Sequence, residues 1–397
     1  MNKKTLKDID VKGKKILVRC DFNVPVDENG NITDDTRIIS SLPTINYLLD
    51  EGASLILMSH LGRPKGKADK RYSLMPVAKR LGELLNKNIV FEDCSTVVDD
   101  KVRKKASELK SGDVILLQNT RFRKEETKNS GNFAKELSSL GEIFVNDAFG
   151  TAHRAHSSNV GICAYLPSAV GFLVEKEIEV MGNAVENPKR PLTAILGGSK
   201  VSDKIGVIEN LLNIADNILI GGGMAYTFLK SKGYSTGTSI LEEDKVDLAG
   251  QLMEKAGNKN INLMLPADIV VAKELENNTE YYTTDADKIP ENFMGLDIGD
   301  KTIELFGKVI KESKTIIWNG PLGVFEMDNF AKGTNSIARF IAENKRAISI
   351  VGGGDSASAV KKTGLEDQIT HISTGGGASL EFLEGKILPG IDAVDNK

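Results

Sequence analysis

Glycine clusters and lysines in the second half of the sequence, and arginines in the first half, are the residues whose types and spacing could do chemistry. Of the 38 glycines, 25 lie in residues 191–397, and the 11 prolines are no more than an average chain has. Four glycine clusters follow short apolar runs, at 197–198, 221–223, 352–354 and 375–377. Glycine lets the main chain approach a ligand closely, and a helix N-terminus offers free N–H groups to an anion. The clusters predict a nucleotide or phosphate site. A strand-to-helix turn that needs glycine for its own backbone is the alternative for any single cluster.

Charged side chains beside these glycines strengthen that prediction. Lys200 and Lys204 have the i,i+4 spacing that places two side chains on one face of a helix, here in its first turn. Cations are unfavourable at a helix N-terminus unless an anion lies between them, so the pair indicates a polyanion; a solvated lysine pair is the alternative. Asp355 could cap a helix or hold Mg²⁺ on nucleotide phosphates, and Ser356 could cap the helix or contact phosphate.

Two common nucleotide motifs do not account for the site. The sequence has no GxxxxGK[ST] segment, so it has no P-loop. Gly352, Gly354 and Ala357 loosely match a dinucleotide fingerprint, but the next apolar run ends in Thr374 and glycines where an acidic residue should bind the ribose. A dinucleotide site is therefore disfavoured.

The first half carries basic side chains at the ends of its apolar runs. They are Arg37, His60, Arg63, Arg121 and Arg154, the last flanked by His153 and His156. Arginine binds carboxylate and phosphate through two parallel hydrogen bonds, so the group predicts an anionic substrate. The neighbouring Asp21 and Asn23 would suit glycerate or sugar hydroxyls.

The elements that must position these residues are parallel strands alternating with helices. Nine short, continuously apolar runs indicate strands covered on both faces, and their alternation with helical segments indicates βαβ units. The runs are 15–18, 54–58, 114–117, 143–145, 192–196, 217–220, 315–318, 347–351 and 368–373. Ligands of open α/β sheets bind at the carboxyl ends of the strands, where the glycines and arginines lie. We therefore predict an α/β protein with two doubly wound, Rossmann-like parallel-sheet domains, each with one functional edge.

A long helix between two proline residues is predicted to join the domains. Apolar residues at helical spacing run through Val170–Asn187, which precedes Pro188 and Pro191. This gives an N-terminal domain over 1–169, an interdomain helix over 170–187 and a C-terminal domain over 188–377.

Composition and charge limit the partners and the cellular compartment that the protein can have. The formal net charge of −4 argues against non-specific nucleic-acid binding, and no run approaches the ~18 apolar residues of a membrane span. The N-terminus lacks the apolar core of a signal peptide, and the three cysteines have no CxxC spacing. These features predict a cytoplasmic protein that binds neither nucleic acid nor membrane.

Taken together, seven segments closely resemble phosphoglycerate kinase. They keep that family's order and span nearly the whole chain. The segments are RCDFNVP at 19–25, SHLGRP at 59–64, NDAFGTAHRAH at 146–156, GGSKV at 197–201, WNGPLGVFE at 318–326, GGGD at 352–355 and STGGG at 373–377. Ser199 and Ser356 depart from the Ala and Thr of many members, and both stay small.

The resemblance implies a monomeric glycolytic kinase that transfers a phosphoryl group between 1,3-bisphosphoglycerate and ADP, giving 3-phosphoglycerate and ATP, with Mg²⁺. It implies that residues 378–397 return to the N-terminal domain. By motif match the glycerate substrate would lie on Asp21, Asn23, Arg37, His60, Leu61, Gly62, Arg63, Arg121 and Arg154. The nucleotide would lie on Gly198, Lys200, Lys204, Gly221, Gly222, Gly295, Pro321, Glu326, Gly353, Gly354, Asp355 and Ser356, with Glu326 on the ribose and Asp355 on Mg²⁺.

Phosphoryl transfer needs in-line positioning and charge stabilisation rather than covalent chemistry from the protein. We expect Arg37, Lys200, Lys204 and the helix dipole beginning at Gly376 to supply the charge, after the domains close on hinges at the ends of the 170–187 helix and near 375–380. Two other classes remain open on the residues alone: a hinged anion-binding module without catalysis, and an NAD-dependent dehydrogenase.

Overall fold

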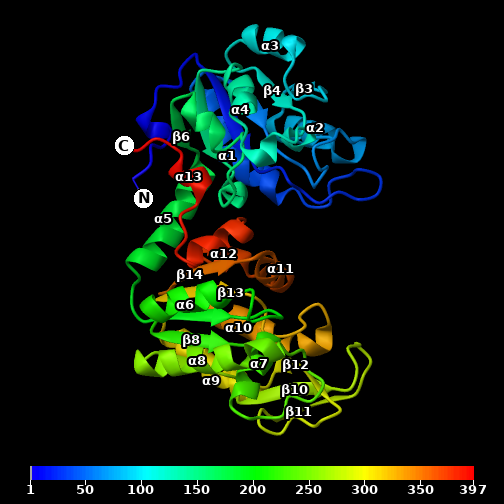
Figure 1. The fold of residues 1–397 in the computed structure, drawn as a ribbon, viewed down its shortest axis with the longest axis vertical. Helices are drawn as coiled ribbons and strands as arrows, with labels where there is room; N and C mark the ends of the chain where they lie inside the picture. Colours follow the sequence, from blue (N-terminus) through cyan, green and yellow to red (C-terminus); the bar gives the residue numbers. More distant parts are fainter. Residues whose placement is uncertain (1) are drawn as a thin grey trace. The chain divides into compact units, whose positions relative to one another are not determined.

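The computed structural model describes residues 2–397, and its chain forms two compact units (Figure 1). Of the described residues, the first unit comprises 2–179 and Ile387–Lys397, and the second comprises Val180–Lys386. The division therefore falls inside the helix predicted over 170–187. The chain rejoins the first unit at Ile387 rather than at the predicted residue 378.

The first unit is built on a six-stranded parallel sheet in the order β3-β4-β2-β1-β5-β6. Its strands are β1 (Lys15–Cys20), β2 (Ser54–Met58), β3 (Val90–Glu92), β4 (Val114–Leu117), β5 (Ile143–Asp147) and β6 (Ser168–Val170). Its helices are α1 (Thr36–Asp50), α2 (Met75–Leu85), α3 (Asp100–Ser107) and α4 (Gly131–Ser138), and α5 (Phe172–Glu186) leads into the second unit. The C-terminal helix α13 (Pro389–Asp392) also belongs to the first unit.

Alternate residues of each central strand enter different hydrophobic clusters, which explains the continuously apolar runs. In β2, Leu55 and Leu57 pack in the cluster that contains α1 and α2 residues, whereas Ile56 and Met58 pack in the cluster that contains α3 and α4 residues. The sheet is therefore covered on both faces, as the absence of polar alternation predicts.

The second unit has a six-stranded parallel sheet in the order β15-β14-β13-β7-β8-β9 and a three-stranded antiparallel sheet in the order β11-β10-β12. The parallel strands are β7 (Leu192–Leu196), β8 (Asn217–Ile220), β9 (Asn262–Met264), β13 (Thr315–Asn319), β14 (Ile348–Gly352) and β15 (His371–Ile372). The antiparallel strands are β10 (Asp268–Ala272), β11 (Tyr281–Asp285) and β12 (Met294–Ile298). The helices are α6 (Ile205–Ile214), α7 (Met224–Ser231), α8 (Val246–Asn258), α9 (Asp300–Glu312), α10 (Lys332–Glu343), α11 (Gly354–Thr363) and α12 (Gly377–Leu383).

The predicted α/β class with two parallel, helix-covered sheets is confirmed. The antiparallel sheet was not predicted, and the run over 368–373 is only a two-residue strand at 371–372 preceded by a 3-10 turn. The lone tryptophan, Trp318, is fully buried in β13, so its fluorescence reports on the second unit.

Chain termini meet in the first unit. Lys3 and Asn396 form a β-bridge, and Lys3 Nζ donates to the carbonyl oxygens of Asp392 and Val394 at 2.7 and 2.9 Å. Figure 1 shows this red C-terminal segment beside the blue N-terminal residues. The first unit is thus assembled from both ends of the chain.

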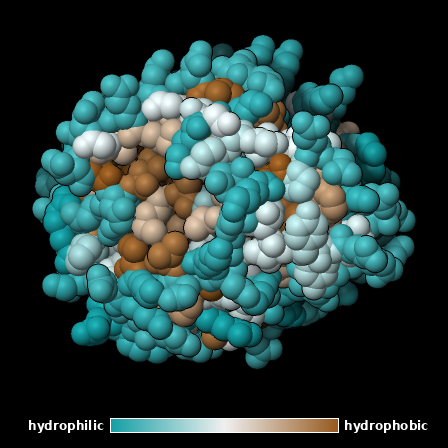
Figure 2. Space-filling view, turned by 90° about the horizontal axis from the view of Figure 1, so that it is seen from below, coloured by the Kyte–Doolittle hydropathy of each residue, from teal (hydrophilic) through white to brown (hydrophobic). Residues whose placement is uncertain are grey.

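Hydrophilic side chains cover most of the face that Figure 2 presents, and apolar side chains gather in one hollow of that face. None of the helices within residues 2–397 combines the length and the apolar character that a membrane crossing requires.

The N-terminus of α5 is anchored to the first unit by a buried carboxylate. Asp147, at the end of β5 and fully buried, accepts the N–H of Leu173 at 2.9 Å, while Thr44 Oγ1 of α1 accepts the N–H of Phe172 at 2.9 Å. Burial raises the pKa of Asp147 to about 7. Side-chain capping of these first N–H groups fixes where the helix begins.

Replacing Asp147 by Asn is expected to flatten the pH dependence of stability. An unfolded aspartate has a pKa of about 3.9, so the folded protein retains a proton between about pH 4 and 7 that the unfolded chain has released. The stabilisation is complete below about pH 4 and is lost as the pH rises through 7. Urea unfolding followed by circular dichroism at pH 5 and pH 8 measures it; equal pH slopes in both proteins would contradict the assignment.

Candidate functional site

The loops after β1 and β2 bring polar residues together at the carboxyl edge of the first sheet. Asp21 forms an ion pair with Arg37 in the first turn of α1. Asn23 Oδ1 accepts the N–H of Gly62 at 2.8 Å, which ties the two loops to each other. Leu61 is buried in the core, so its contribution to a site comes from its main chain.

A basic pocket of about 340 Å³ opens beside these loops. Three of the predicted residues, Arg63, Arg121 and Arg154, line it together with His156. Arg63 and Arg154 are exposed, whereas Arg121 is only 7% exposed and donates to the Gly62 carbonyl at 2.9 Å. No Asp or Glu is among the described residues that line the pocket. Its other cations are Lys65, Arg123, Lys124 and Lys128.

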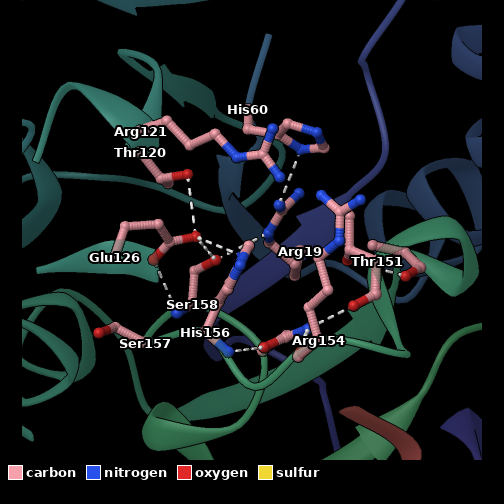
Figure 3. Close-up of polar contacts among 12 residues, drawn as sticks. Arg19, His60, Thr120, Arg121, Glu126, Thr151, Arg154, His156, Ser157 and Ser158 are labelled. Atoms are coloured by element: carbon pink, nitrogen blue, oxygen red, sulfur yellow. Dashed lines mark hydrogen bonds and ion pairs between the residues drawn. The ribbon is translucent and has the colours of Figure 1, made fainter. Parts of the chain in front are cut away.

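Beneath the basic side chains lies a buried polar network (Figure 3). Arg19 and Glu126 are both 0% exposed and are bridged by Ser158. Arg19 Nε donates to Ser158 Oγ at 2.8 Å, and that hydroxyl donates to Glu126 Oε1 at 2.6 Å. Glu126 also accepts from the Thr120 hydroxyl at 3.1 Å and from the Ser158 N–H at 3.1 Å. The carboxylate supplies the counter-charge for a guanidinium that water cannot reach.

Burial and mutual repulsion lower the pKa values of several basic groups in this site. Burial first, and then the nearby Arg19 and Arg154, lower the pKa of Arg121 to about 10. Burial and the positive charges around it lower the pKa of His156 to about 3. The pKa of His60 lies well below its usual value for the same reasons. Both histidines are neutral at physiological pH, so the positive charge of the pocket resides on Arg and Lys.

In the second unit, three loops at the carboxyl edge of the sheet interlock through their backbones. Gly198 N–H donates to the Pro321 carbonyl at 2.9 Å, and Gly222 N–H donates to the Leu322 carbonyl at 3.1 Å. A Cβ added at Gly197 would lie 2.0 Å from the Pro321 carbonyl oxygen, and one at Gly221 would lie 2.5 Å from Leu322. These glycines are required by loop packing itself.

Other glycines of the same edge face open space. Cβ atoms added at Gly198, Gly354 or Gly376 would meet nothing within 4 Å, although Gly198 and Gly376 have φ of +101° and +53°. At Gly353, with φ of +91°, the nearest atom would be Asn319 Nδ2 at 3.4 Å. Open main chain in unusual conformations is what close approach to a ligand requires. The glycine excess therefore has two origins, loop packing and open backbone.

Lys200 and Lys204 do not lie in the first turn of a helix, contrary to the spacing argument. They flank a turn in which Lys204 N–H donates to the Val201 carbonyl at 2.8 Å, and α6 begins only at Ile205. Within this turn, Glu242 accepts both the N–H and the hydroxyl of Ser202, at 3.0 and 2.5 Å. Lys200 is exposed.

Lys204 instead points to the end of β13. Its ammonium donates to Asn319 Oδ1, and burial lowers its pKa to about 8, an effect that the negative charges of Asp203, Asp355 and Glu384 oppose. Asn319 Nδ2 is buried and has no hydrogen-bond partner among residues 2–397. A partly desolvated cation beside an unused N–H donor suits an anion.

The remaining predicted residues of the second unit lie in different environments. Asp355 is exposed as the second residue of α11, and Glu326 is exposed in the loop after β13. Ser356 is fully buried, and its hydroxyl accepts the Gly320 N–H at 2.6 Å, so it joins α11 to the β13 loop. Gly295 is buried in β12, where an added Cβ would lie 2.1 Å from the Tyr226 hydroxyl oxygen.

Comparisons with known proteins identify the family of the chain. The family model described as phosphoglycerate kinase matches residues 6–386. The chain belongs to the phosphoglycerate kinase family.

Relatives and solved structures match over essentially their full lengths. The phosphoglycerate kinase of Finegoldia magna is 59% identical over 397 residues, covering 100% of both chains, and that of Clostridioides difficile is 59% identical, covering 100% of this chain and 99% of the relative. The structure of the Coxiella burnetii phosphoglycerate kinase aligns with a TM-score of 0.90 at 43% identity, and that of Pyrococcus horikoshii with 0.84 at 34%; each alignment covers 98% of both chains. The chain is thus a phosphotransferase with a carboxyl group as acceptor, and the dehydrogenase and the non-catalytic binding module are excluded.

Three residues that contact or lie near the predicted site residues were not themselves predicted from the sequence. Asn319 is the last residue of β13, and its position after an apolar run could have marked it. Arg19 lies inside β1, where a charged residue is unexpected in a buried strand. Glu126 stands in a stretch rich in charged residues that is typical of a solvated surface, so no local pattern indicates its burial.

A matched pair of alanine substitutions should separate the two kinds of glycine. Gly197→Ala is expected to destabilise the second unit by about 3 kcal/mol, because its Cβ would overlap the backbone at Pro321. Gly354→Ala, into open space at a helix start, should leave stability unchanged and raise the KM for ATP. Trp318 fluorescence during urea unfolding and steady-state kinetics measure both effects. Equal stability losses would contradict the distinction.

Proposed function

We propose that this enzyme catalyses reversible, Mg²⁺-dependent phosphoryl transfer between 1,3-bisphosphoglycerate and ADP, giving 3-phosphoglycerate and ATP, with the glycerate on the first unit. The observation that carries the substrate assignment is the basic pocket, where seven Arg and Lys side chains and no carboxylate line one cavity. Such a pocket fits a small ligand with several negative charges. The proposed glycerate-binding residues are Asp21, Asn23, Arg37, His60, Leu61, Gly62, Arg63, Arg121 and Arg154.

The nucleotide is assigned to the open glycine edge of the second unit. The open space beside Gly198 and Gly376, the positive φ of Gly353 and the half-buried ammonium of Lys204 support phosphate binding there. The other proposed nucleotide residues are Lys200, Gly221, Gly222, Gly295, Pro321, Glu326, Gly354, Asp355 and Ser356.

Asp355 fits a Mg²⁺ site because it is an exposed carboxylate. Mg²⁺ on a nucleotide is bound mainly by phosphates and water and needs only one or two carboxylates from the protein. When bound, the ion would neutralise charge on the nucleotide phosphates. The pocket requires no general base, since the acceptor carboxylate of 3-phosphoglycerate is already ionised.

Charge stabilisation by fixed cations and dipoles is the proposed source of catalysis. Arg37 lies in the first turn of α1, fixed by its ion pair with Asp21, and Lys204 is fixed by Asn319. Together with Lys200 and the N–H groups at Gly376, they would stabilise the transferring phosphoryl oxygens. In-line transfer requires reacting atoms about 3–3.5 Å apart, so we propose closure of the two units during the reaction.

A coupled assay of ADP release that depends on both ATP and 3-phosphoglycerate tests the function. Turnover only when both substrates and Mg²⁺ are present is the expected result. Nucleotide binding without 3-phosphoglycerate-dependent turnover would refute the proposal. We also propose that the protein is a cytoplasmic monomer. The free thiols of Cys20, Cys94 and Cys163 fit the reducing cytoplasm, and sedimentation velocity tests the oligomeric state.

Arg63→Ala is expected to raise the KM for 3-phosphoglycerate about tenfold while leaving kcat nearly unchanged. Arg63 lines the basic pocket and is exposed, so its removal costs one charged contact to the bound substrate without disturbing the core. Arg71→Ala is the matched control, because the Arg71 side chain is 81% exposed and pairs with Asp69 at the surface. An unchanged KM would mean that Arg63 does not bind the substrate.

A further inference from the structure

His60 contacts the buried Arg19 through one defined ring atom. Arg19 Nη2 lies 3.1 Å from His60 Nδ1, and the two residues are 0% and 4% exposed. The contact links the end of β1 to the loop after β2. Figure 3 shows the imidazole with Nδ1 toward the guanidinium and the other ring nitrogen on the far side.

The chemistry of the two groups fixes the direction of this hydrogen bond. A guanidinium has five N–H donors, no acceptor, and does not lose its proton in proteins. His60 Nδ1 must therefore accept the bond and carry no hydrogen. A neutral imidazole holds its single proton on the other nitrogen, so His60 carries its hydrogen on Nε2.

The donor is itself immobilised. Arg19 Nε is bonded to Ser158 Oγ at 2.8 Å, and Ser158 is bonded to Glu126 through both its hydroxyl and its N–H. Arg19 Nη1 donates to the Cys20 carbonyl on its other side. With the guanidinium held at both ends, rotation away from His60 would break several buried bonds.

His60 Nε2 has no hydrogen bond within the part of the chain that the structure describes. Burial first, and then the cationic neighbours Arg19, Arg121 and Arg37, disfavour a positive charge on the ring. An N–H donor without a charge, placed among cations, is suited to an oxygen of an anionic ligand.

We propose that Arg19 is a positioning residue that fixes His60 in the Nε2–H tautomer, so that His60 offers the glycerate substrate a neutral N–H donor. The tautomer follows from the geometry of the free protein, and the contact with substrate rests on the proposed function.

Nuclear magnetic resonance of the unmodified, ¹⁵N-histidine-labelled protein tests the tautomer directly. The chain has four histidines, and His60→Gln assigns the relevant signals. Protonated and bare ring nitrogens resonate far apart, so an Nε2–H pattern at pH 7.5 without substrate supports the proposal. An Nδ1–H pattern or an imidazolium would overturn it. Saturating 3-phosphoglycerate should shift the Nε2 signal, and a signal that does not move would overturn the substrate contact.

Variants at Arg19 test its role in fixing the ring. Arg19→Met should populate the Nδ1–H tautomer and raise the KM for 3-phosphoglycerate about tenfold with kcat within about twofold, and Arg19→Lys should restore both. Arg103→Met, on the surface-facing α3, is the control and should change neither.

A folded Arg19→Met protein with the original His60 pattern would overturn the proposal. If Arg19→Met does not fold, Arg19→Lys and the unmodified protein still decide it. Absence of any ATP-dependent turnover with 3-phosphoglycerate would refute the proposed function and leave the tautomer result standing.

Discussion

Replacing Lys204 by Ala is expected to lower kcat by about 100-fold or more, as removal of one preorganised transition-state contact does. The ammonium is half-buried and held by Asn319 Oδ1, so it costs no reorganisation when charge develops on the phosphoryl oxygens. Burial also makes its interaction with that charge stronger than in water. Steady-state kinetics in the ATP-forming direction measure the loss.

Two comparisons make the Lys204 result specific. Lys259→Ala removes an exposed lysine of the same unit that is bonded to Asn213, and it should leave kcat unchanged. Thermal unfolding of Lys204→Ala should stay close to that of the unmodified enzyme, because one half-buried polar contact contributes about 1 kcal/mol. Near-normal kcat in a folded Lys204→Ala enzyme would rule out its catalytic role.

Glu126→Ala is expected to destabilise the first unit by about 3–5 kcal/mol, the range seen when one partner of a buried ion pair is removed. Without the carboxylate, the guanidinium of Arg19 is left buried and uncompensated, since both residues are 0% exposed. The hydroxyl of Thr120 and both donors of Ser158 lose their acceptor as well.

The two units provide separate readouts for the Glu126 experiment. Circular dichroism reports both units, whereas Trp318 reports only the second. In Glu126→Ala, the dichroic transition in urea should begin before the fluorescence transition. Glu136→Ala is the control, because Glu136 pairs with Arg123 at the surface with 31% of its side chain exposed and should cost less than about 1 kcal/mol. Coincident, unshifted transitions in Glu126→Ala would contradict the assigned role of the pair.

Much of the fold could be predicted because a strand covered on both faces leaves a continuous apolar run. β2 and β7 coincide with the predicted runs 54–58 and 192–196. The antiparallel sheet escaped because β11 is largely exposed and reads YYTTD, and because β10 is followed by a strand instead of a helix. Neither fits the βαβ pattern.

The candidate site was predictable where it depends on position along a strand. Arg63, Arg121 and Arg154 line one pocket, as their places near strand ends predicted. The pairing of Arg19 with Glu126 joins residues far apart in sequence, so no local spacing indicates it. The placement of Lys204 was wrong in detail, since α6 begins only at Ile205. The turn before it is bonded through Ser202 to Glu242, and no local spacing indicates that contact.

The meeting of the chain termini has a consequence for how the protein is made. Residues 387–397 belong to the first unit, while the second unit is one uninterrupted stretch of chain. Domains fold as units while the ribosome adds about 5–20 residues per second. The first unit is mostly synthesised earlier, but it includes residues 387–397, which follow the whole second unit along the chain. Most of the first unit is thus made before the second unit begins, but its fold is complete only when residues 387–397 have been made.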